Sequence, residues 1–134
     1  MYNHSKNKSS LYAPISIGEL FDKKSILEIK MNKISGGQLE NISKELKLIS
    51  EIIEENKIII EKDLYNKLMN INLNLWEIED KIRLKENSKE FDKAFIDLAR
   101  SVYTENDKRA KIKRQINVKY NSNIVEEKFY SKYT

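Results

Sequence analysis

Apolar residues recur along this chain at intervals of three and four, the spacing of one face of an α-helix. Four stretches show this period, and the glycine-containing segment 35–37 and the polar pair 87–88 break it. Only residues 58–60 resemble a strand, and a lone three-residue strand has no partner to pair with. The pattern therefore predicts an all-α fold. The expected helices span residues 17–32, 39–55, 61–86 and 89–120.

The connections between these helices are short, and short connections make neighbouring helices antiparallel. We therefore expect an antiparallel up-down bundle of about four helices, two of them long. A helix of about 30 residues is roughly 45 Å long, so the third and fourth helices should project beyond the first two. Their projecting ends would suit a dimer interface.

The first expected helix is apolar on two sides. Leu20 and Leu27 belong to one stripe, whereas Ile26 and Ile29 lie on nearly the opposite side. A helix of this kind is either central to its domain or packs against a second partner.

Two start signals and a change in composition define the expected organisation. Ser16 and Glu19 form a Ser-x-x-Glu capping box ahead of the first helix, and Ser88 is placed to cap the fourth. Both ends of the chain are more polar than the middle. We expect a disordered arm at 1–13, the helical bundle at 14–120, and a tail that docks on the bundle at 121–134.

The composition excludes several kinds of site. The chain has no cysteine and one histidine, His4, so thiolate sites, histidine metal sites and cysteine nucleophiles are excluded. We predict neither a metal nor a cofactor. No apolar run approaches the roughly 20 residues of a membrane-spanning helix, and the first residues lack the apolar centre of a signal peptide. A cytoplasmic location without membrane contact is expected.

The most informative feature is an interruption in the fourth helix. After Val102 no aliphatic residue occurs until Ala110. The apolar stripe, continued through this gap, falls on Glu105 and Arg109. Charges on a core-facing stripe cost several kcal/mol unless other groups compensate them, so we expect polar partners on another helix.

The beginning of the first helix is expected to supply those partners, because it should share one end of the bundle with the second half of the fourth. The side chains that would meet there are Glu19, Asp22, Lys23, Asn106, Arg109 and Lys113. One interpretation is a buried salt-bridge network that fixes how the helices align. The other is a binding site, in which Arg109 and Lys113, with Arg100, hold an anion. Glu19 or Asp22 would then be the catalytic base.

A second polar group lies on one flank of the third helix. Trp76, Glu79 and Arg83 follow one another there, and Glu79 and Arg83 are an i,i+4 pair. We interpret Trp76, the single tryptophan, as a packing anchor between helices rather than a platform for a ligand.

Nucleic-acid binding is not expected, although the net charge is +4 and residues 108–119 carry six positive charges without an acid. The basic run lies at a helix C-terminus, where cations interact favourably with the macrodipole. No aromatic platform or recognised DNA-binding motif accompanies it.

One acidic pattern superficially suggests a magnesium enzyme. The spacing Glu51-x-x-Glu54 and Glu77-x-x-Asp80 is similar to the motif of all-α nucleotide pyrophosphohydrolases, in which facing carboxylates hold magnesium. Here Glu77 points away from the apolar seam of the third helix. In an antiparallel hairpin the two pairs are also roughly 15 Å apart along the axis. We therefore interpret this pattern as a chance match.

Four segments resemble a bacterial and phage family that is known as domain of unknown function 6165. They are ISIGELFDKKSILEIK (15–30), LWEIEDKIRLKE (75–86), LARSVYTENDKRAKIKRQIN (98–117) and VEEKFY (125–130). Lys24 departs from the pattern, which has an apolar residue there. The polar residues shared with the pattern are Glu19, Asp22, Lys23, Glu28, Lys30, Glu79, Asp80, Arg83, Arg100, Tyr103, Asn106, Asp107, Arg109, Lys113 and Asn117. The resemblance implies no activity. It implies a genetic context near glycosyltransferases of surface-polysaccharide clusters.

Two functions from different classes follow. The first is a helical interaction or assembly module whose partner is a second copy or another protein, and the resemblance implies that it is accessory to surface-polysaccharide biosynthesis. The alternative is an enzyme or binder for an anionic, sugar-nucleotide-like small molecule, which would use the polar layer at one end of the bundle.

Overall fold

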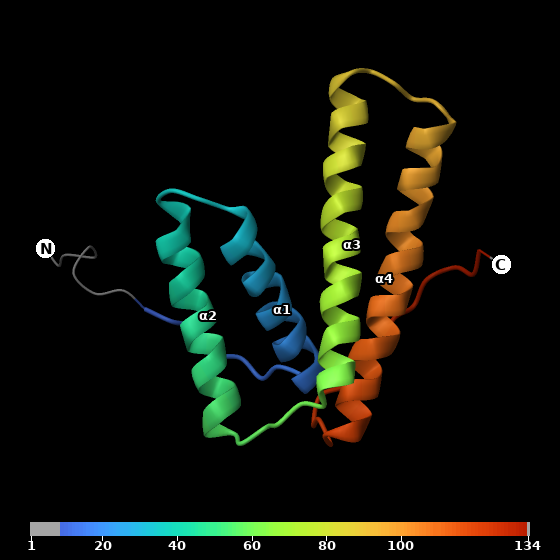
Figure 1. Ribbon diagram of the computed structural model, residues 1–134. Coiled ribbons are helices and arrows are strands. Elements are labelled where there is room, and N and C mark those ends of the chain that lie inside the picture. The colour runs from blue at the N-terminus through green and yellow to red at the C-terminus, as the bar shows by residue number, and fades with distance from the viewer. Residues whose placement is uncertain (1–8, 134) are drawn as a thin grey trace, which may run out of the picture.

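The structure is a computed structural model that describes residues 9–133, and Figure 1 shows its helices packed into one bundle. Within the described residues there is no strand, so the predicted all-α fold is confirmed. Residues 1–8, most of the arm expected at 1–13, lie outside the described part. The helices are α1 (Ile17–Lys33), α2 (Gln38–Glu55), α3 (Lys62–Asn87) and α4 (Lys93–Lys119).

The start of α4 differs from the prediction. Asp92, not Ser88, is its N-cap, and the Asp92 side chain accepts a hydrogen bond from the Phe95 amide at 3.0 Å. Ser88 instead ends α3, because the next residue, Lys89, takes a left-handed conformation with φ of 55° that no α-helix continues through. Lys85 contacts Asp92 at 2.9 Å and ties the turn to α3. Ser88 and Asp92 are both residue types that favour the N-cap position, and the prediction that Ser88 occupies it was wrong.

The central helix is α1, as its two apolar sides suggested. It packs against each of the other helices, whereas α2 comes close to α1 alone among the described helices. Leu20 and Leu27 are buried along one side of α1, and Phe21 and Ile29 are buried on other sides. The molecule therefore consists of two helical hairpins, joined mainly through α1 (Figure 1).

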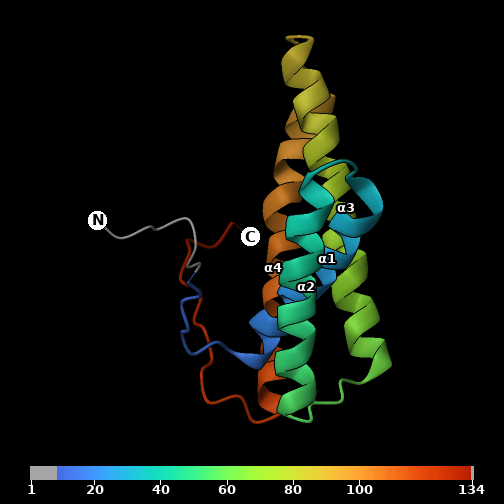
Figure 2. The ribbon, with the colours of Figure 1, turned by 90° about the vertical axis from the view of Figure 1, so that its left-hand side faces the viewer.

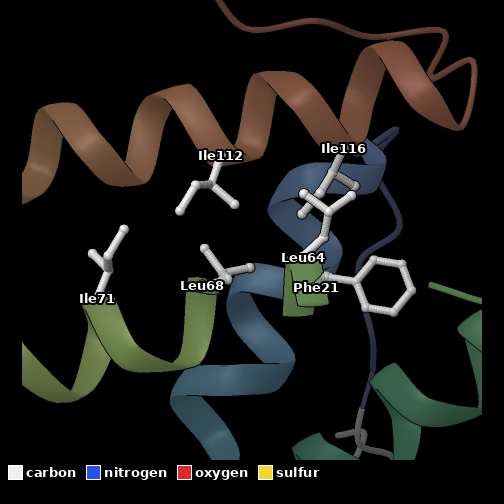
Figure 3. Packing of buried hydrophobic residues seen from close by; sticks show 6 residues of the cluster. All are labelled: Phe21, Leu64, Leu68, Ile71, Ile112 and Ile116. Carbon is white, nitrogen blue, oxygen red and sulfur yellow. The ribbon is translucent and has the colours of Figure 1, made fainter. Parts of the chain in front are cut away.

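The hydrophobic core lies where α1 crosses the lower part of the α3–α4 hairpin. Figure 3 shows Phe21 of α1 beneath side chains from both other helices. Phe21 is 1% exposed and meets the Tyr65 ring edge-on, with 6.2 Å between centroids. The other members of the cluster are Leu64, Leu68, Ile71, Ile112 and Ile116.

The first turn of α1 lies unusually close to α4. A Cβ atom on Gly18 would come within 2.5 Å of the Lys113 carbonyl oxygen, so only glycine fits there. The Gly18 amide donates a 2.6 Å hydrogen bond to the Asn117 side chain. Ser16 caps α1, because its hydroxyl oxygen accepts a hydrogen bond from the Glu19 amide at 3.0 Å. This is one of the two hydrogen bonds of the predicted capping box. These contacts fix the level at which α1 meets α4.

The long hairpin continues past the ends of α1 and α2, as Figures 1 and 2 both show. Beyond this point α3 and α4 pack mainly on each other. Residues 121–133 have no helix and follow the outer side of α4, held by pairs such as Arg114 with Glu127 at 3.1 Å and Tyr133 with Asp107 at 2.8 Å. No helix among the described residues has both the length and the hydropathy needed to cross a bilayer.

Candidate functional site

Polar side chains from α1, α3 and α4 meet beside the hydrophobic core, and we call this group the polar cluster. Its members are Glu19, Asp22, Ser25, Asn72, Arg109 and Lys113. Asn72 of α3 is at its centre and is 4% exposed. Its amide group donates to Asp22 at 2.8 Å and to Ser25 at 2.7 Å, and its oxygen accepts from Arg109 at 3.3 Å. Both amide hydrogens of Asn72 and its carbonyl oxygen are therefore used within the cluster.

The buried carboxylate of the cluster is Asp22, whose side chain is 5% exposed. Besides the bond from Asn72, it has the Lys113 ammonium group at 3.9 Å. The Ser25 hydroxyl donates to the Asp22 backbone carbonyl at 2.7 Å, which holds Ser25 in place to accept from Asn72. The opposite charge and the hydrogen bond compensate the buried carboxylate of Asp22, so removing one of these partners would leave it uncompensated and would destabilise the helix contact.

Lys113 connects the cluster to the surface. Its ammonium group forms an ion pair with Glu19 and lies 3.6 Å from Glu126 of the C-terminal segment. Burial alone would raise the pKa of Glu126. A hydrogen bond from Ser16 and the charge of Lys113 outweigh burial, and the pKa lies below its usual value. The cluster thus also attaches the C-terminal segment to α1 and α4.

The interruption in α4 therefore marks a real meeting point, although not every predicted residue is part of it. Glu19, Asp22, Arg109 and Lys113 come together. Lys23 is exposed, and Asn106 is half-buried in α4 without a hydrogen bond to the cluster residues. Arg100 is exposed and donates to the Tyr103 hydroxyl at 3.4 Å. Glu105, on the same stripe, pairs with Lys108 at 3.0 Å.

Sequence reasoning missed the residues that complete the cluster. Asn72 directly follows Ile71 on α3, a helix whose regular apolar seam gave no reason to look beside it. Ser25 likewise lies on α1 beside apolar residues and was not predicted. The sequence offered one chemical signal for Asn72. A core-facing Arg109 needs a hydrogen-bond acceptor, and an asparagine beside the apolar seam of α3 can supply one. Glu126 lies in a non-helical segment and had no signal in helical periodicity.

Two surface hollows lie elsewhere. One, of about 550 Å³, lies between the start of α3 and the end of α4, beside Asn66, Asn70 and Gln115. The other, of about 280 Å³, lies between the far ends of the same helices, beside Leu84 and Leu98. No member of the polar cluster lines either hollow. The described residues also contain no group of three or more acids or histidines that could hold a metal ion.

The far end of the long hairpin, residues 76–100, is the second feature of interest, and we call it the hairpin tip. Large apolar side chains are exposed on it: Leu84 is 66%, Phe91 55% and Ile96 52% exposed. The predicted group of Trp76, Glu79 and Arg83 belongs to the same region. Trp76 is half-buried, and Arg83 contacts Glu79 at 3.5 Å with both side chains largely in solvent.

A comparison with protein families gives one match, which spans residues 11–133. The chain belongs to the family of unknown function DUF6165. The resemblance found in the sequence is thereby confirmed. No curated protein and no solved structure matches the chain.

DUF6165 membership brings no activity, substrate or partner with it. The function of this DUF6165 chain therefore has to follow from two features of the structure, the polar cluster and the hairpin tip. Most of the polar cluster is closed upon itself, since Lys113 pairs with the acids of α1 and Asn72 bonds its neighbours, whereas Arg109 has no acid partner among the described residues. The hairpin tip is open, since its apolar side chains face solvent.

Proposed function

We propose that the chain is a helical interaction and assembly module that docks through the hairpin tip. The observation that carries this proposal is the exposure of Leu84, Phe91 and Ile96 at the end of two helices that extend past the rest of the fold (Figure 2). Full burial of one such side chain contributes up to about 1.5–3 kcal/mol. Three of them on one projecting element are a substantial part of a docking surface.

The lower half of the same hairpin supports this interpretation. There, α1 packs across α3 and α4, and Phe21 completes a core with Leu68 and Ile116. Near the tip, α3 and α4 continue without α1 or α2 beside them (Figure 1). A partner helix at the tip would repeat the packing that α1 provides lower down.

The alternative function, an enzyme or binder for an anionic small molecule, has less support. The groups that would bind the anion, Arg109 and Lys113, are engaged by Asn72 and by the acids of α1. This alternative stays a prediction, and a thermal-shift screen with sugar nucleotides would reveal a ligand that raises the stability of the fold. The surface-polysaccharide context and the cytoplasmic location also stay predictions.

The proposal is tested by the size of the full chain in extracts of its own cells. We compare the wild type with Leu84→Glu plus Ile96→Glu on the tip, and with Leu48→Glu plus Ile52→Glu on α2 as matched control. All four side chains are exposed, so the changes should leave the fold intact, which circular dichroism checks. We expect a large assembly for the wild type and control, and the size of a single chain for the tip variant. A wild-type chain that elutes alone, or an assembly that survives the tip changes, would contradict the proposal.

A further inference from the structure

We infer that the chain attaches to the surface of an anionic lipid bilayer through its two non-helical end segments, residues 9–15 and 121–133. This inference goes beyond the proposed assembly role and does not depend on the hairpin tip. It also departs from the expectation that the chain makes no membrane contact. The attachment is peripheral, since no described helix has the length and hydropathy needed to span a bilayer.

The last part of the C-terminal segment, residues 128–133, is attached to α4 at both of its ends, and we call it the aromatic arch. Asp107 of α4 supplies both attachments. Its carboxylate pairs with Lys128 and accepts a 2.8 Å hydrogen bond from the Tyr133 hydroxyl. The arch is therefore held in place by polar contacts at its ends and not by burial of the residues between them.

Those intervening residues include two aromatic side chains that point away from the protein. Phe129 is 100% and Tyr130 76% exposed. The Lys128 ammonium group lies 5.2 Å from the centre of the Tyr130 ring, which links this ring to the attached end of the arch. Burial of such rings is favourable, so the arch presents apolar surface that a partner outside the chain can cover.

The N-terminal segment provides a second exposed apolar group. Leu11 is 98% and Tyr12 91% exposed, and residues 9–15 contain no charged side chain. Figure 2 shows this segment and the C-terminal segment on the same side of the bundle, outside the helices. In Figure 1 the first passes behind α2 and the second runs beside α4, so they are separated across the width of the molecule. A broad, flat surface can contact both at once.

Basic side chains lie around the attachment of the arch on α4. Arg100 and Lys111 lie seven and four residues from Asp107, which places all three on one side of the helix. Both are exposed, as is Lys132 in the arch, and none of these three bases forms an ion pair among the described residues. Residues 100–133 contain nine basic and four acidic side chains, so this part of the chain is positively charged.

These features together favour a bilayer over other partners. Aromatic side chains with lysine or arginine beside them suit the headgroup region, because the rings enter the apolar boundary while the cations attract anionic lipids. A pocket on a protein would bind one of the two segments, whereas a bilayer is wide enough for both. A single-stranded nucleic acid would stack on the rings of the arch but would leave Leu11 without a role.

The experiment measures how much of the purified full chain co-sediments with vesicles of phosphatidylcholine that contain about 30% phosphatidylglycerol. The test variant is Phe129→Ser plus Tyr130→Ser. The matched control is Phe91→Ser plus Ile96→Ser on the hairpin tip, since all four side chains are exposed. We expect the wild type and the control to bind equally, and the partition coefficient of the test variant to fall about tenfold or more. Circular dichroism checks that each variant keeps the fold.

Two further arms test the other parts of the inference. Leu11→Ser plus Tyr12→Ser should also lower the partition coefficient, because the N-terminal segment is the second contact. Vesicles of phosphatidylcholine alone should bind the wild type several-fold more weakly, because each basic side chain near an anionic surface contributes to the attraction.

Three results would overturn the inference: a wild-type chain that does not bind the anionic vesicles, binding that the test variant keeps, or an equal loss for the tip control. A wild-type chain that binds a fluorescent single-stranded oligonucleotide but no vesicle would overturn it in favour of nucleic acid. Vesicle binding by a chain that elutes alone from cell extracts would support this inference and contradict the proposed function, so the two can fail separately.

Discussion

Replacing Asn72 with alanine separates the two interpretations of the polar cluster. Asn72 is 4% exposed and holds Asp22, Ser25 and Arg109 at once. If the cluster is a structural network, the substitution must destabilise the fold. If the cluster is a binding site held ready for a ligand, removal of a site residue commonly leaves stability unchanged or raises it.

The expected loss follows from the groups left without a partner. Asp22 and Ser25 are both buried and would each lose the hydrogen bond from Asn72. A buried polar group left unsatisfied costs about 1–3 kcal/mol. Arg109 reaches solvent and regains a bond from water, so it adds little. We expect the free energy of unfolding to fall by about 3 kcal/mol.

Urea unfolding followed by circular dichroism measures this loss, and Asn74→Ala is the matched control. Asn74 lies on the same helix and is exposed. Both substitutions gain the same helix propensity, of about 0.5 kcal/mol, so the difference between them reports the buried hydrogen bonds. If Asn72→Ala is as stable as Asn74→Ala, the structural interpretation of the cluster is refuted.

Three further predictions concern the packing and the C-terminal segment. Gly18→Ala places a methyl group against the backbone of α4 and should destabilise by about 2 kcal/mol, whereas Gly37→Ala, in open space, should not, as thermal unfolding checks. Leu68→Ala should cost about 3 kcal/mol in urea unfolding because Leu68 is fully buried, and Leu84→Ala under about 0.5 kcal/mol at a concentration that keeps the chain monomeric. A hydrogen bond from Lys128 lowers the pKa of Asp107, so its contribution to holding the C-terminal segment is complete above the ordinary carboxyl pKa and is lost as the pH falls through the lowered value. After correction for the intrinsic pH dependence of amide exchange, the exchange rate in that segment should therefore increase on acidification. A corrected rate that does not change with pH would contradict this prediction.

The helices could be predicted from the sequence because their apolar residues keep one period over many turns. The central place of α1 could also be predicted, from apolar residues on two opposite sides. The meeting point of α1 and α4 followed from charges on the core-facing stripe at Arg109. Each of these signals is a repeated or interrupted pattern within one helix.

The remaining features depend on contacts between helices that no single pattern records. Lys23 follows Asp22 by one residue, which turns it by about 100° around the helix and out of the cluster. Arg100 lies roughly 13 Å along α4 from Arg109, which places it beside the exposed hairpin. The position of α2, which comes close to α1 alone among the described helices, is not recorded in its own apolar pattern, and Ile58 and Ile60 of the α2–α3 connection pack against the core.

Site-specific photo-crosslinking in the cells that make the chain tests the central claim most directly. A photoreactive residue replaces Ile96 on the hairpin tip or Leu48 on α2, both exposed and apolar. The account predicts abundant crosslinked adducts from position 96 and few from position 48. Equal yields from the two positions, or adducts from position 48 alone, would contradict it.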